Sequence, residues 1–131
     1  MKATARRENG TFKHHLEIRD HDLLSDEPEE NGGEDSGPSP QELLAASLAS
    51  CTAITMEMYA ARKGWDIGDL IVDVNYEPAQ RGSPTKFQMN VRIPKELPEE
   101  QREKLMQIAA KCPVHRTLEG EVMFEEKVEL V

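Results

Sequence analysis

Apolar and polar residues follow two different periods along this chain, and the periods predict its elements. Residues 11–18 alternate as a strand does, and Asn9-Gly10 before them is typical of a tight two-residue hairpin turn. Residues 23–40 break every period and are rich in acidic residues, glycine and proline, which indicates a loop. A hairpin followed by a long loop is therefore expected at the N-terminus.

A long helix is predicted over residues 40–63. Ser39 is a good N-cap, Pro40 suits the first helical position, and Glu42 completes a capping box with Ser39. Gly64 suits the end of the helix. One apolar stripe consists of Leu44, Leu48, Cys51, Thr55 and Met58. Other faces are also apolar, so we expect a helix buried on several sides.

The rest of the chain predicts strands around a second helix. Residues 69–78 and 86–94 alternate as an antiparallel pair of strands, and residues 97–112 form a helix with a buried stripe at Leu105, Ile108 and Ala109. Residues 121–131 read as a last strand, with a partly buried face of Val122, Phe124, Val128 and Leu130. The pattern predicts a single α+β domain over residues 1–131, with largely antiparallel pairing.

Composition narrows the class of protein. The chain has 131 residues, 37% of them hydrophobic and only 5% aromatic, so burial against a second subunit would supplement its core. Sixteen basic and 25 acidic residues give a net charge of −9, which argues against nucleic acids and anionic membranes as partners. Neither an apolar leader nor an apolar run of about 18 residues is present, so we expect a soluble, cytoplasmic protein.

The two cysteines leave several interpretations open. Cys112 and His115 have a metal-like spacing, but no second close pair of ligands completes a zinc site, since His14 and His15 are adjacent on a strand. Taken alone, each cysteine can be interpreted as a small hydrophobic residue that is buried in the core. A permanent disulfide is not expected in a reducing cytoplasm, where a transient catalytic pair is the other alternative.

Local chemistry ranks the two thiols differently. Cys112 precedes Pro113 at the expected start of a new helical turn, where backbone N–H groups favour a thiolate. Cys51 lies in the middle of an apolar helix, where burial raises the pKa of a thiol, so it needs a cationic partner to react. His115 either tunes Cys112 or satisfies a backbone group at a helix end.

Two segments of the chain are "GGEDSGPSPQELLAASLASCTAITM" and "AAKCPVHRTL", with the expected strand pair and helix between them. Together they resemble the OsmC/Ohr family of osmotically induced and organic hydroperoxide resistance proteins. The "GGEDSGPSP" loop is most similar to the YhfA-like branch. The resemblance implies an intertwined homodimer, with long central cysteine helices and active sites at the interface between the subunits.

The resemblance also implies roles for single residues. Cys51 would be the peroxidatic thiolate, and Cys112 the resolving thiol that forms a disulfide with its sulfenic acid. An N-terminal arginine, Arg6 or Arg7 and less readily Arg19, would lower the pKa of Cys51. The apolar residues Leu48, Ile54 and Met56 would line the pocket for an alkyl tail.

One position departs from the pattern of the better-known peroxidase branches. They carry a glutamate ten residues before the reacting cysteine, where this chain has Gln41. Glu42 lies on the opposite side of the helix, about 180° from Cys51, whereas Gln41 lies about 80° away. Gln41 accepts a hydrogen bond from an arginine but supplies no charge.

The leading hypothesis is therefore the reduction of organic hydroperoxides to alcohols and water, without a metal or organic cofactor. The resemblance implies that a cellular dithiol such as a dihydrolipoyl group reduces the disulfide again. The alternative is a non-catalytic or weakly catalytic protein of the same fold that binds a small molecule or senses oxidants, which Gln41 supports.

Overall fold

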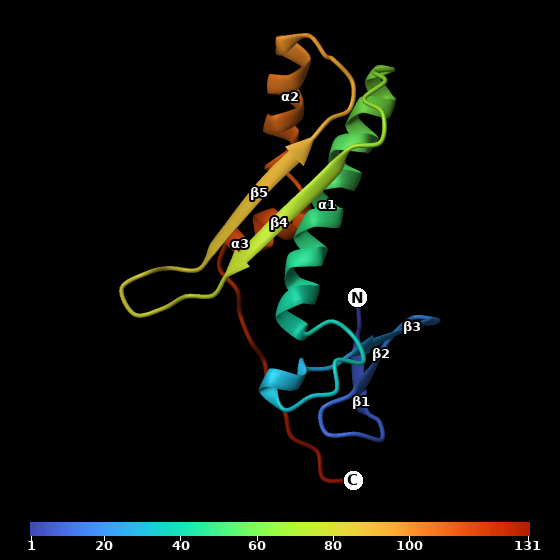
Figure 1. The fold of residues 1–131 in the computed structure, drawn as a ribbon, viewed down its shortest axis with the longest axis vertical. Helices are drawn as coiled ribbons and strands as arrows, with labels where there is room; N and C mark the ends of the chain where they lie inside the picture. The colour runs from blue at the N-terminus through green and yellow to red at the C-terminus, as the bar shows by residue number, and fades with distance from the viewer. The chain divides into compact units, whose positions relative to one another are not determined.

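The computed structural model describes all residues from 1 to 131 and has the mixed α+β architecture that the sequence predicts (Figure 1). The chain divides into two compact units. Residues 1–46 and 75–88 form the N-terminal unit, and residues 47–74 and 89–131 form the C-terminal unit. Each unit has its own set of internal contacts.

The N-terminal unit contains a three-stranded antiparallel sheet. Its strands are β1 (Thr4–Arg7), β2 (His14–Ile18) and β3 (His21–Ser25), in the order β1-β2-β3. The predicted hairpin is present, but its loop spans residues 8–13, because Arg7 pairs with His14. The expected two-residue turn at Asn9-Gly10 is therefore wrong.

Strand β3 extends to Ser25, into the loop that the sequence predicts from residue 23, and this is a second correction. Ile18 pairs with His21 across a two-residue turn, in which Arg19 adopts a left-handed φ of 54°. The sequence of β3 has no clear alternation, and its backbone groups gain hydrogen bonds only because β2 lies beside them. Tertiary pairing thus overrides a weak local signal.

A buried carboxylate organises the loop that follows β3. Asp26 is only 2% exposed, and it accepts hydrogen bonds from the backbone N–H groups of Glu27 (2.7 Å), Glu34 (3.2 Å) and Ser36 (3.1 Å). Burial raises the pKa of Asp26, but these donors more than offset it and hold the pKa below its ordinary value. Gly33 is required here, since a Cβ atom would lie 1.9 Å from the Glu27 carbonyl oxygen.

Replacing Asp26 by asparagine is expected to destabilise the N-terminal unit at neutral pH. The amide NH2 replaces one of the two carboxylate oxygens, so at least one of the three backbone N–H groups loses its acceptor and faces another donor. Because the folded pKa of Asp26 is depressed, its contribution is complete above its ordinary value of 3.8 and is lost as the pH falls through the folded pKa. Urea midpoints followed by circular dichroism should therefore fall toward acid more steeply in the wild type than in Asp26→Asn.

Asp35→Asn is the matched control for this experiment. Asp35 is exposed and adopts a left-handed φ of 54°, which asparagine tolerates well. We expect its urea midpoint to stay within error of the wild type. Equal losses in the two variants would contradict a specific role for the Asp26 carboxylate.

Helix α1 (Pro40–Lys63) has the bounds that the sequence predicts. The capping box is confirmed: Ser39 N donates to Glu42 Oε1 at 2.9 Å, and Glu42 N donates to Ser39 Oγ at 3.2 Å. These hydrogen bonds lower the pKa of Glu42. Gly64, with a φ of 70°, ends the helix as expected.

The buried face of α1 differs from the expected stripe. Residues four apart along one face are buried, namely Leu48, Thr52, Met56 and Ala60. Met58, which we expected in the stripe, is 60% exposed, and Ile54 on another face is 53% exposed. By length and apolar composition alone, α1 passes the test for a membrane-crossing helix. Met56 and Ala60 of this helix belong to the hydrophobic core, so packing accounts for a part of its apolar composition.

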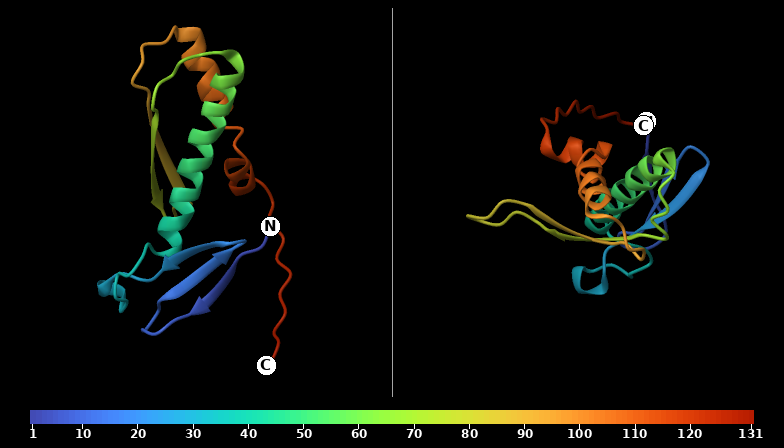
Figure 2. Two further views of the ribbon diagram at one scale, coloured as in Figure 1. Left: turned by 90° about the vertical axis from the view of Figure 1, so that its right-hand side faces the viewer. Right: turned by 90° about the horizontal axis from the view of Figure 1, so that it is seen from above.

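The hydrophobic core of the C-terminal unit lies between α1 and helix α2 (Glu99–Ala109), which run beside one another in both views of Figure 2. The buried members are Met56 and Ala60 from α1, Ile67 and Leu70 from the connection, and Leu105 and Ala109 from α2. Two paired strands, β4 (Ile71–Glu77) and β5 (Lys86–Arg92), contribute Val72 and Val91. Their residues alternate between more and less exposed, as predicted.

The end of the chain gives a third correction. Helix α3 (Pro113–Glu119) is followed by residues 120–131, which form no strand although the sequence predicts one. A strand needs a neighbour for its backbone hydrogen bonds, and no neighbouring strand pairs with this segment. Its apolar side chains are exposed: Val122 54%, Phe124 81%, Val128 87% and Leu130 98%.

Candidate active site

Cys112 lies at the N-cap of α3, as the sequence predicts. Its side chain is fully buried, and the backbone N–H of His115 donates to its Sγ at 3.2 Å. Pro113 at the first helical position fixes the direction in which the helix starts. The last turn of α2 and the first turn of α3 thus hold this thiol in place.

Cys51 is a free, partly buried thiol on α1, and the fold brings it next to Cys112 and the start of α3. Burial raises the pKa of Cys51, as expected for a thiol on an apolar helix. The neighbouring Cys112 raises it further, whereas hydrogen bonds from Val114 N–H and the Thr55 hydroxyl lower it. The two cysteines are therefore adjacent and free, and no cationic side chain is among the groups that shift the pKa of Cys51.

Thr52 is a member of the site that sequence reasoning missed. Its fully buried hydroxyl lies 3.8 Å from Cys112 Sγ and donates to Met89 Sδ on β5 at 3.7 Å. A signal was present, since Thr52 shares the four-residue spacing of Leu48 and Met56. A polar residue on the buried face of a helix needs a partner, and here its partners are sulfur atoms.

The ring of His115 contacts a backbone carbonyl and a carboxylate. Its Nδ1 atom lies 2.8 Å from the carbonyl oxygen of Ala110 and 3.3 Å from Glu119 Oε1. Of the two expected roles, the structure supports the contact with a backbone group at a helix end. His14 and His15 belong to the N-terminal unit, where His14 Nδ1 lies 2.8 Å from the Phe12 carbonyl oxygen and His15 lies between the carboxylates of Glu8 and Asp22.

The other residues expected at the site lie as follows. On β1, Arg6 Nε pairs with Glu17 Oε1 at 2.9 Å, and an Arg7 guanidinium nitrogen donates to the Gly10 carbonyl at 3.4 Å. Both side chains belong to the N-terminal unit, as does Gln41, which is exposed in the first turn of α1. Leu48 and Met56 lie on the buried face of α1 and Ile54 on an exposed one, so these three do not share a surface.

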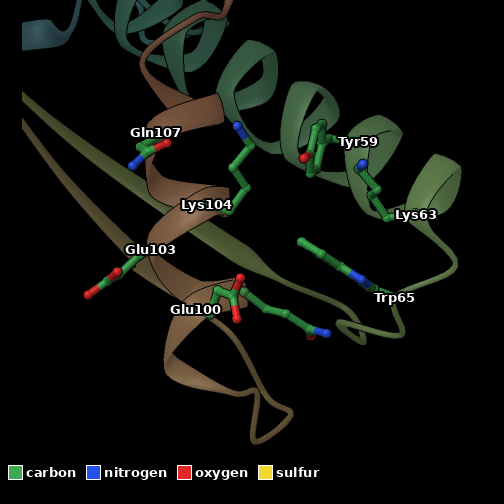
Figure 3. A pocket seen from close by; sticks show the side chains of 8 residues that line it. Tyr59, Lys63, Trp65, Glu100, Glu103, Lys104 and Gln107 are labelled. Carbon is green, nitrogen blue, oxygen red and sulfur yellow. The ribbon is translucent and has the colours of Figure 1, made fainter.

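A separate hollow of about 490 Å³ lies between the C-terminal end of α1 and a face of α2 that begins at its first turn (Figure 3). The rings of Tyr59 and Trp65 pack edge to face, with their centroids 5.7 Å apart. The ammonium groups of Lys63 and Lys104 lie 5.6 and 6.0 Å from the centroid of the Tyr59 ring. The lining contains neither cysteine, and the remaining members are Glu100, Gln101, Glu103 and Gln107. The thiol chemistry of the chain is therefore not located in this hollow.

The fold and the site thus define a protein with two adjacent free thiols, one on a long core helix and one at the cap of a short helix. The family of OsmC-like proteins matches residues 33–127, which include both cysteines, so the chain belongs to this family. No curated protein matches the chain.

Solved structures of similar fold support this assignment. One is a candidate osmotic stress-induced and detoxification response protein from Psychrobacter arcticus, with 21% identity, a TM-score of 0.77 and coverage of 89% of this chain and 87% of that chain. An organic hydroperoxide resistance protein OsmC from Legionella pneumophila has 23% identity, a TM-score of 0.66 and coverage of 91% and 88%. OhrB from Bacillus subtilis, also an organic hydroperoxide resistance protein, has 24% identity and a TM-score of 0.60, with coverage of 91% of this chain and 90% of that chain.

Proposed function

We propose that this protein is a thiol-dependent peroxidase that reduces organic hydroperoxides through Cys51 and Cys112, in defence against oxidative stress in the cytoplasm. The observation that carries the proposal is the adjacency of the two free thiols, the only cysteines in the chain, although they lie 61 positions apart. The names of the similar hydroperoxide resistance proteins support the substrate class.

Each thiol has a distinct role in the proposed cycle. The Cys51 thiolate attacks the O–O bond and becomes a sulfenic acid, while the alkoxide takes up a proton and leaves as the alcohol. Cys112 then condenses with the sulfenic acid to give a disulfide and water. A dithiol such as a dihydrolipoyl group reduces the disulfide and completes the turnover. The reaction calls for no metal or organic cofactor.

The proposed mechanism needs a cation near Cys51, because the thiol pKa is raised in its own unit. We assign this task to Arg6 or Arg7 on β1, with Gln41 as the hydrogen-bond partner of the guanidinium. Neighbouring residues on a strand point to opposite faces of the sheet, so only one of the two arginines serves. We propose that Ile54, which is exposed on α1, contacts the alkyl part of the substrate, and that Leu48 and Met56 support this helix from its buried face.

A homodimer with active sites at its interface is part of the proposal. A single chain leaves two apolar surfaces uncovered: the face of α1 with Ile54 and Met58, and the segment of residues 120–131. The segment has the alternation of a strand but no neighbour, which a second copy of the chain would supply. Burial of these surfaces would also compensate for the low aromatic content of the core.

Sedimentation equilibrium tests the dimer. We expect the wild type to have twice the mass of the chain, and Phe124→Ser to raise the dissociation constant about tenfold or more, because the aromatic ring loses its burial. Glu125→Ser is the control, since its side chain alternates to the other face of an extended segment. A wild type that sediments as a monomer at all concentrations would contradict the dimer.

A second function is favoured by a specific observation, the raised pKa of Cys51 together with Gln41 in place of an acidic residue. A protein with these features would bind an apolar molecule or sense oxidants by slow disulfide formation. Hydroperoxide consumption separates the two functions. Reduced protein is mixed with cumene hydroperoxide and excess dihydrolipoamide: many turnovers per chain support the peroxidase, and a single turnover or none supports the binding or sensing protein.

A further inference from the structure

We propose that Thr52 is a positioning residue for Cys112: its hydroxyl turns from Met89 Sδ to donate a hydrogen bond to Cys112 Sγ when that sulfur carries negative charge. The inference rests on the proposed redox pair of Cys51 and Cys112. It assigns a part in the formation and the reduction of their disulfide to a residue outside the pair.

The contacts of Thr52 carry this proposal. Its side chain is fully buried, and the hydroxyl makes hydrogen bonds to sulfur atoms alone, at 3.7 Å to Met89 and 3.8 Å to Cys112. Threonine in a helix commonly bonds to a carbonyl one turn earlier, and no such bond is present here. The hydroxyl is therefore available for chemistry at the thiols.

The neutral site contains a directed chain of donors. His115 N–H donates to Cys112 Sγ, the Cys112 thiol faces Thr52 Oγ1, and the Thr52 hydroxyl donates to Met89 Sδ. A thiolate accepts hydrogen bonds but donates none, and a charged acceptor competes strongly with a thioether, which accepts weakly. Ionisation of Cys112 therefore reverses the direction of the hydrogen bond between Thr52 and Cys112. The hydrogen bond to Met89 Sδ that is lost in exchange is a weak one.

Two steps of the proposed cycle place charge on Cys112. When the disulfide forms, Cys112 gives up its proton, its sulfur bonds to Cys51 Sγ, the S–O bond of the sulfenic acid breaks, and the hydroxide leaves as water with that proton. When the dithiol reductant attacks Cys51 Sγ, the S–S bond breaks and Cys112 leaves with the electron pair as a thiolate. In both steps the Thr52 hydroxyl and the His115 N–H donate hydrogen bonds to the charged sulfur.

Disulfide reduction tests the role of Thr52 without any peroxide. The disulfide is formed with diamide, and its reduction by dithiothreitol is followed by tryptophan fluorescence and by thiol content. We expect Thr52→Val, which keeps the shape and loses the donor, to slow the reduction about tenfold. Thr52→Ser should restore the rate, and Met89→Leu should leave it unchanged or faster, since only the competing acceptor is removed.

The possible outcomes separate this inference from the proposed function. An unchanged rate in Thr52→Val, or equal slowing in Thr52→Val and Thr52→Ser, would overturn the inference, because the first shows no effect and the second shows a packing effect. Absent hydroperoxide turnover with a Thr52-dependent reduction rate would overturn the peroxidase alone.

A second measurement needs only Cys112. In Cys51→Ser, the ultraviolet absorbance of the Cys112 thiolate is followed against pH, with His115 and Glu119 as the neighbouring titratable groups in every variant. Adding Thr52→Val should move the rise in absorbance to higher pH, and Thr52→Ser should not. Identical curves for all three proteins would overturn the inference even if no disulfide forms.

Discussion

Replacing Cys51 by serine should lower hydroperoxide turnover by about a thousandfold or more, because a hydroxyl at this position supplies no thiolate for attack on the O–O bond. The side chains differ by one atom, and Cys51 is only partly buried, so the fold should survive. The measurement is the consumption of cumene hydroperoxide with excess dihydrolipoamide as reductant. Unfolding curves of the variant establish that activity and not stability has been lost.

Cys112→Ser is the matched variant, and it should behave differently. Cys51 should still reduce one equivalent of peroxide, so mass spectrometry should find a single added oxygen on that residue, and steady turnover should be slow. The order of roles is wrong if Cys51→Ser keeps a single turnover and Cys112→Ser loses it. That result would favour the position of Cys112 at a helix N-cap as the source of the reactive thiolate.

Leu105→Ala is expected to reduce the free energy of unfolding by about 2–5 kcal/mol. Leu105 is fully buried on α2, in the core cluster that also contains Met56 and Ala60 of α1. Truncation removes apolar contacts and leaves a cavity that a close-packed core fills only in part. Urea unfolding can be followed by the fluorescence of Trp65, the only tryptophan, which packs against this cluster.

Met106→Ala is the control, since it removes a side chain of similar size from the adjacent position. Met106 is 49% exposed, so the expected loss is about 0.5 kcal/mol or less. Both variants are measured at one protein concentration, because dimerisation would add to the apparent stability. Equal losses in the two variants would show that α2 is not anchored through Leu105.

Local chemistry in the sequence determined the helices and the places of both thiols. Ser39, Pro40 and Glu42 satisfy the first N–H groups of α1, and Gly64 adopts the left-handed conformation that ends it, so its bounds depend on neighbours in sequence. The same holds for Cys112 and Pro113 at the start of α3. The two cysteine segments were also sufficient to indicate the OsmC-like family, which matches residues 33–127.

The tertiary structure decided what depends on distant partners. Strand β3 exists because β2 satisfies its backbone, whereas residues 120–131 have the pattern of a strand and no neighbour. Packing against α2, β5 and Cys112 selected the stripe with Thr52 and Met56 as the buried face of α1, where the sequence pattern was apolar on several sides. That choice also set the Thr52 hydroxyl beside Cys112, 60 positions away, a contact that no local period encodes.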